Sequence, residues 1–301
     1  MRWLLCAFPL LSLPVAFAQQ YPGLGRVEIA VNAIRDSASH YFYYSYTLSN
    51  DFRNTGSIAE FEVDVTRSAN TVLLDTVGLQ FGGDEFQELS FRERWPFLAP
   101  YTVPVGFLSS PEHWDMSWGN YSLAHMRMDT LFIAPGKNVS GLVLMSRGIP
   151  GIRKCTVTPD FNDDLYFPSL DDTTREMTTD QMDSIRAAGV FHGLTVGPVA
   201  PPLRIEPVAF LDETVSTIRQ SYAQNWVKSR SAMDKYSQKF AGARSLLQLG
   251  DIEGAMLSLR KILTAASTDN SSELSPEGFA LIYYNTEYLL EHLSISSPTN
   301  R

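Results

Sequence analysis

The sequence predicts a multidomain protein of the β plus α class, with an antiparallel β-sandwich followed by a four-helix bundle-like domain. Three observations support this prediction. Apolar residues recur at every second position from residue 19 to residue 197, and at every third or fourth position from residue 208 to residue 295. A proline-rich stretch, residues 198–207, separates the two patterns. The 301 residues suffice for two domains, each with a core of its own.

The first eighteen residues are typical of a secretory signal peptide. Met1 and Arg2 form a short basic start, residues 3–17 are almost wholly apolar, and Ala16-Phe17-Ala18 is a small-x-small cleavage motif before Gln19. We therefore expect cleavage after Ala18 and a secreted or periplasmic protein that carries no membrane anchor.

In the N-terminal half, alternating apolar and polar residues predict strands with one dry and one wet face. Val27, Ile29 and Val31 share a face of the first predicted strand, and Phe61 and Val63 alternate with glutamates in a later one. The other predicted strands are 42–48, 71–79, 101–107, 121–128, 130–134, 141–146 and 153–158, and turn signals such as FGGD and RGIPG separate them. Many short strands at this spacing are typical of an antiparallel sandwich.

Four prolines between residues 198 and 207 predict a stiff extended connector, and four amphipathic stripes follow it. The stripes cover residues 208–222, 233–247, 252–263 and 279–293, and residues 296–301 form a polar tail. Gly250 suits a left-handed helix end, Asp251 suits the cap of the next helix, and Ser275 stands before Pro276 at the start of the last one.

Charge and cysteine content limit the classes of partner. Loss of Arg2 with the leader leaves 23 basic against 33 acidic residues, a net charge of about −10 that argues against nucleic acid or an anionic membrane as the main partner. Cys6 would leave with the leader, so Cys155 would remain alone without an intrachain disulfide. A secreted protein without disulfides indicates a bacterial source.

The helical half resembles a known family. The segment LLQLGDIEGAMLSLRKIL reads as helix, tight turn and helix, but the 34-residue recurrence of a tetratricopeptide array is missing. Together with the later phrase YNTEYLLEHL, the segment resembles the FIMAH domain family over residues 210–293. This resemblance implies a C-terminal accessory module of an exported bacterial protein. The phrases YSYTLSN and LFIAPGKNVSGLVLMS make the N-terminal half similar to the immunoglobulin-like domains of bacterial surface proteins.

The segment SPEHWDMSWGNY is the strongest candidate for ligand binding. Trp114, Trp118 and Tyr121 lie close together in the sequence, with Glu112 and Asp115 among them. Flat apolar rings beside polar acceptors suit stacking on sugars or docking of a protein. The alternative is that the two tryptophans, four residues apart on one strand face, belong to the core.

The segment DFNDDLYFPSLDD has part of the spacing of a calcium loop. Asp160, Asn162, Asp164 and Asp171 occupy positions one, three, five and twelve of such a loop. Position six is Leu165, where the sharp bend requires glycine, so an acidic solvated loop is the alternative interpretation. No cofactor other than calcium is expected.

No pattern in the sequence indicates a reaction. The five histidines are not paired at metal-ligand spacing, and no Gly-x-Ser-x-Gly motif of an acyl hydrolase occurs. Cys155 beside Arg153 and Lys154 is either a reactive thiol or a small buried apolar residue. We expect a secreted, non-catalytic binding, adhesion or accessory module with a polysaccharide or protein partner; the alternatives are a structural envelope or matrix component and a secreted hydrolase.

Overall fold

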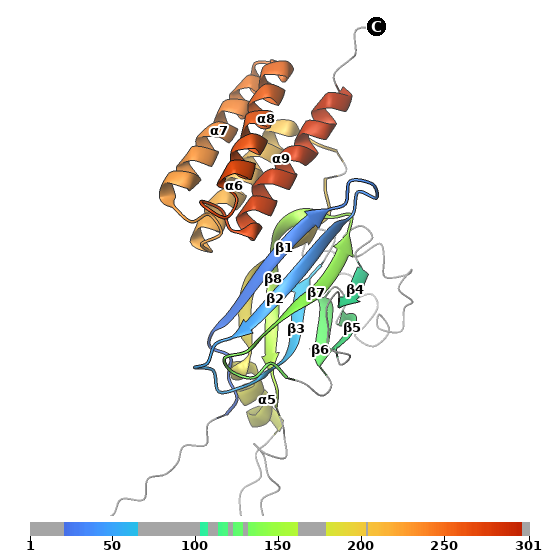
Figure 1. Cartoon of the computed structure of the whole chain (residues 1–301), viewed down its shortest axis with the longest axis vertical. Coiled ribbons are helices and arrows are strands. Elements are labelled where there is room, and N and C mark those ends of the chain that lie inside the picture. The colour runs from blue at the N-terminus through green and yellow to red at the C-terminus, as the bar shows by residue number, and fades with distance from the viewer. Residues whose placement is uncertain are drawn as a thin grey trace, which may run out of the picture.

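The computed structural model describes residues 21–65, 103–107, 114–119, 123–128, 132–161, 179–202 and 204–296. Within these residues the chain forms nine strands in two antiparallel sheets, together with five helices, so the protein is of mixed β and α class (Figure 1). The predicted strand at residues 71–79, the leader and the polar tail after residue 296 lie outside the described residues.

The first sheet has four strands in the order β1-β2-β7-β4. These strands are β1 (Val27–Arg35), β2 (Phe42–Asn50), β7 (Asn138–Ser146) and β4 (Val103–Phe107). The second sheet has five strands in the order β5-β6-β3-β8-β9. They are β5 (Trp114–Gly119), β6 (Leu123–Met128), β3 (Ile58–Asp64), β8 (Ile149–Pro159) and β9 (Phe191–Val199).

Large apolar side chains from both sheets share one core. Every second residue of β2 is buried, including Tyr44 and Tyr46, and the ring of Tyr46 meets that of Phe61 of β3 edge-on at 5.4 Å. Their hydroxyl groups stay paired: Tyr44 Oη donates to the Gly148 carbonyl at 2.8 Å, and Tyr46 Oη donates to the Val196 carbonyl at 3.0 Å. Burial of large rings with satisfied hydroxyl groups stabilises the contact between the sheets.

The four helices predicted from the 3.6-residue stripes are confirmed. They are α6 (Pro207–Ala223), α7 (Arg230–Gln248), α8 (Ile252–Asp269) and α9 (Pro276–Ser296), each packed on the next, with α6 also packed on α9. The predicted turn chemistry is present as well. Gly250 has a φ of 78°, and the Asp251 carboxylate accepts a hydrogen bond from the Gly254 amide at 2.9 Å.

The strand-rich half differs from the prediction in several elements. Helix α5 (Thr179–Gly189) was not predicted because it is mostly exposed and so has no apolar stripe. Strands β5 and β9 were not among the predicted strands either, and β9 ends at Val199, inside the stretch assigned to the connector. The prediction of a strand at residues 130–134 was wrong for the described part, where Ile133 forms only an isolated bridge with Ile58.

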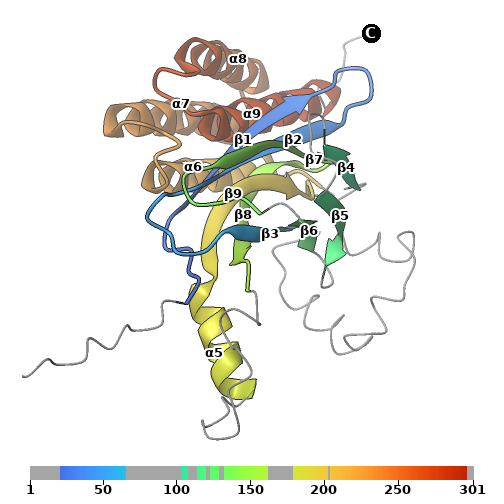
Figure 2. The ribbon, with the colours of Figure 1, turned by 60° about the horizontal axis from the view of Figure 1, so that its bottom comes forward.

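Helix α9 joins the helices to the sheets. It packs against β1, β8 and β9, and Figure 2 shows it lying along β1. At this contact the ring of Tyr284 meets the ring of Phe42 edge-on at 5.0 Å. The buried residues of the sheets and the helices form one continuous cluster, so the two halves pack against each other through α9.

Candidate functional site

The outward face of the five-stranded sheet brings polar residues together from all five strands. The strand register places Ser117 of β5 opposite His125 of β6, and His125 opposite Glu62 of β3. Glu62 pairs in turn with Thr156 of β8, which pairs with His192 of β9. We call this transverse line of five residues the polar row.

A second line runs beside the polar row, two residues further along each strand. It contains Asp115 of β5, Arg127 of β6, Glu60 of β3 and Thr158 of β8. The two lines carry both signs of charge as well as hydroxyl and imidazole positions. The register therefore aligns residue types that can donate and accept hydrogen bonds across the sheet.

Strict alternation along β3 and β8 produces this face. Phe61 and Val63 are fully buried, whereas Glu60 and Glu62, which alternate with them, are only half-buried. On β8 the residues that flank Thr156 are buried, and Thr156 itself is half-buried. Because successive strand residues point to opposite faces, burial of the apolar set fixes the polar set toward the outside.

His192 supplies an accessible functional group at the β9 end of the polar row. Its side chain is exposed, and its Nδ1 lies 3.4 Å from the hydroxyl oxygen of Thr156. Lys154 is also exposed and pairs by register with Leu194, the side chain of which is 37% exposed. This end of the face thus places an imidazole, an ammonium and an apolar side chain next to one another.

Two groups of β8 point the other way, into the core. The buried guanidinium of Arg153 donates from Nε and Nη2 to the Pro198 carbonyl at 2.7 and 2.5 Å, and burial lowers the pKa of Arg153. Burial also raises the pKa of Cys155 to about 12. The thiol is therefore protonated at neutral pH, which confirms the buried, unreactive interpretation of this cysteine.

The register separates the residues of the tryptophan segment. Trp118 pairs with Ala124, and Ala124 pairs with the buried Val63, so Trp118 and Trp114 occupy positions on the inner face of the sheet. Asp115 occupies a position on the outer face, in the second line. Glu112 and Tyr121 lie outside the described residues, so ligand binding by the whole segment stays a prediction.

Of the predicted calcium ligands, only Asp160 belongs to the described residues. Its amide donates to the Ser57 carbonyl at 2.8 Å, and burial raises the pKa of its carboxyl group. Asn162, Asp164 and Asp171 lie outside the described residues. The described part of the chain contains no cluster of three His, Cys, Asp or Glu side chains that could hold a metal ion.

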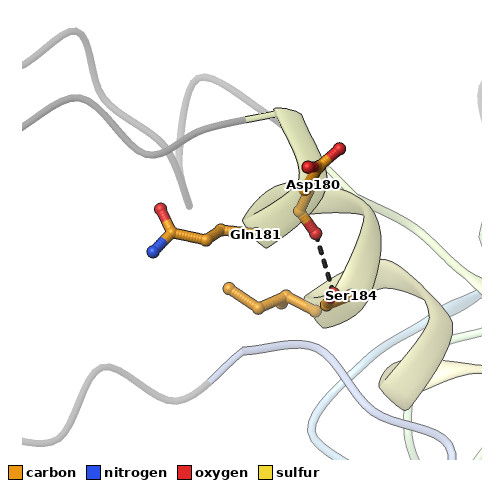
Figure 3. A pocket seen from close by; sticks show the side chains of 4 residues that line it. Asp180, Gln181 and Ser184 are labelled. Carbon is orange, nitrogen blue, oxygen red and sulfur yellow. Dashed lines mark hydrogen bonds between the residues drawn. The ribbon is translucent and has the colours of Figure 1, made fainter.

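A hollow of about 430 Å³ lies beside α5 (Figure 3). Asp180, Gln181, Ser184 and Ile185 line it, all from one helix, and the Ser184 hydroxyl donates to the Asp180 carbonyl at 2.7 Å. This bond is the ordinary contact of a helical serine with the preceding turn. The lining residues that the structure describes therefore offer neither a nucleophile with a base nor a pair of opposed carboxylates.

Sequence reasoning missed the polar row as a unit. Glu60 and Glu62 were recognised as the wet side of a strand, but His125 and His192 were treated as isolated residues. His192 belongs to β9, which was not predicted, and its place beside Thr156 depends on strand pairing. The signal available in the sequence was the alternation around Thr156, whose two neighbours in the chain are apolar.

The chain matches no family model, and no characterised protein is significantly similar to it. None of the helices within the described ranges is long and apolar enough to cross a membrane.

Proposed function

We propose that this protein is an exported, non-catalytic binding module, and that the outward face of its five-stranded sheet binds an extracellular polysaccharide. The observation that carries the proposal is the polar row, in which the strand register aligns serine, histidine, glutamate and threonine positions across five strands. A hydroxyl-rich polymer needs such alternating donors and acceptors. A packed sheet fixes the backbone positions of these residues before the ligand arrives, which lowers the entropic cost of binding.

The fold that we infer for this module is an immunoglobulin-like β-sandwich followed by a four-helix bundle of the FIMAH kind. The ring contact between Tyr46 and Phe61 and the hydroxyl bond from Tyr46 to Val196 support the sandwich. The packing of α6 through α9 around buried residues such as Phe240 and Leu259 supports the bundle. The proposal of export rests on the signal-peptide pattern of residues 1–18, and that of a bacterial source on the lone cysteine after that leader.

The test is thermal unfolding of residues 19–301 in the presence of soluble polysaccharides, cell-wall fragments and calcium. A ligand that binds only the folded state stabilises it by about 2.7 kcal/mol at a hundred times its dissociation constant. We expect one of the polysaccharides to raise the melting temperature. Calcium alone would raise it only if the acidic loop after residue 160 binds the ion.

Paired variants locate the binding face. His192→Ala and Lys154→Ala remove exposed groups from the five-stranded sheet, and each should weaken binding about three- to tenfold, the effect of one lost hydrogen bond. Asn32→Ala removes an exposed polar group from the outward face of β1 and is the matched control. Equal affinity of all three variants would exclude this face. A shift with a protein partner but with none of the polysaccharides would assign the face to protein docking.

A structural role in an envelope or matrix is the second candidate. The continuous core through sheets and helices favours it, since a stiff two-part body suits a spacer. This role predicts no melting shift with any soluble ligand.

A further inference from the structure

Helix α9 covers the outer edge of β1. Strand β1 is the last strand of the four-stranded sheet, so among the described strands the backbone groups on its outer side have no partner. Two of its amides are bonded to side chains of α9 instead: Val31 donates to Oε1 of the buried Glu277 at 2.5 Å, and Arg35 donates to the Tyr284 hydroxyl at 3.4 Å. An exposed strand edge is a template for pairing with another chain, and α9 covers this one.

The spacing of these contacts allows one helix face to follow a strand. Glu277 and Tyr284 are seven residues apart, about 10.5 Å along a helix, while Val31 and Arg35 are four residues apart, about 13 Å along a strand. Asn285, next to Tyr284, donates to the Pro150 carbonyl of β8 at 2.9 Å. Two side chains of α9 therefore bond to the backbone of β1, as a neighbouring strand would do with its own main chain, and a third bonds to β8.

An ion-pair cluster fastens this contact. The guanidinium of Arg35 lies 2.8 Å from a carboxylate oxygen of Glu287 and 2.7 Å from one of Glu291. The two glutamate side chains are 30% and 44% exposed, so water and salt weaken these pairs. We call Arg35, Glu287 and Glu291 the latch.

The helices also pack on one another, besides their contact with β1. Tyr236, Phe240 and Leu259 are fully buried within α7 and α8, and α6 packs on α9. Residues 200–206 connect β9 to α6 and can span about 23 Å when extended. The connector is therefore long enough for the helices to move away from β1 as one body.

We propose that α9 closes a strand-addition site on β1, and that the open edge takes an extended peptide that carries an acidic side chain. The chemistry of the partner follows from what α9 supplies. It provides acceptors for the Val31 and Arg35 amides and carboxylates for the Arg35 guanidinium. An extended chain supplies main-chain acceptors at strand spacing, and one acidic side chain replaces the glutamates on Arg35.

The experiment compares peptide binding by the latch variant Glu287→Gln/Glu291→Gln with binding by the wild-type mature chain. The probe is a fluorescent ten-residue peptide of alternating valine and threonine with one central glutamate, and its control has lysine in place of the glutamate. Loss of two partly exposed ion pairs should shift the closed form toward the open one, so the latch variant should bind the probe about fivefold more tightly. Glu213→Gln/Glu253→Gln removes the same charge from exposed positions of α6 and α8 and should bind like wild type.

Hydrogen exchange at the Val31 and Arg35 amides distinguishes the ways of failing. Faster exchange in the latch variant, slowed again by the glutamate probe, supports the proposal. Faster exchange without peptide binding overturns strand addition, and unchanged exchange overturns the reversible closure. Equal binding of the lysine control overturns the acidic partner.

Discussion

Replacement of Tyr46 by phenylalanine tests how the two sheets are held together. Tyr46 is fully buried on β2, and its hydroxyl donates to the Val196 carbonyl of β9 in the other sheet at 3.0 Å. The change removes one oxygen atom and keeps the ring, so the contact with Phe61 at 5.4 Å remains. A buried carbonyl that loses its partner costs about 1–3 kcal/mol, and we expect Tyr46→Phe to lower the free energy of unfolding by about 1–2 kcal/mol.

The same strand provides a second case and a control. Tyr44 donates to the Gly148 carbonyl at 2.8 Å, so Tyr44→Phe should cost a similar amount. Tyr43 directly precedes Tyr44 on the outward face and is half-buried, and Tyr43→Phe should change stability by less than about 0.5 kcal/mol. Urea denaturation followed by tryptophan fluorescence measures all three, with the slope unchanged and the midpoint shifted. Equal effects of the three variants would refute hydroxyl bonding across the sheets.

Three further predictions concern stability and pH. Burial raises the pKa of Cys155 from 9.0 to about 12, so the buried neutral thiol contributes its full stabilisation below pH 9. This stabilisation is lost as the pH rises toward 12, by about 1.4 kcal/mol per pH unit. In urea titrations, Cys155→Ala should therefore flatten the dependence of the free energy of unfolding on pH between pH 9 and 11. Burial opposes ionisation of Asp269, but hydrogen bonds from Lys235 and Tyr236 outweigh burial and hold the pKa of Asp269 below its usual value. The stabilisation that the ionised carboxylate gives to the folded protein should therefore disappear as the pH falls below about 4. In urea titrations, the free energy of unfolding of Asp269→Asn should fall less steeply with acid than that of wild type. Gly250→Ala should cost about 1 kcal/mol in thermal unfolding because Gly250 has a φ of 78°; a melting temperature equal to that of wild type would contradict this backbone argument.

Local patterns in the sequence were sufficient for several elements. Alternating residues predicted β1, β2 and β3, and stripes at helical spacing predicted α6 through α9, because both periodicities follow from the geometry of a single element. The cap at Asp251 and the turn at Gly250 were also predictable, since each depends on a few neighbouring residues. Helix α5 was missed because a mostly exposed helix needs no apolar stripe.

The sequence by itself determined which residues face inward and which face outward along each of these elements. Tertiary structure alone decided which outward residues become neighbours: His125, Glu62 and His192 come from three strands, and only the pairing register aligns them. It also decided that α9 docks on the edge of β1 through Glu277. Both results depend on pairing between segments far apart in the chain, and the free energy that selects such pairing comes from the shared core rather than from any local pattern.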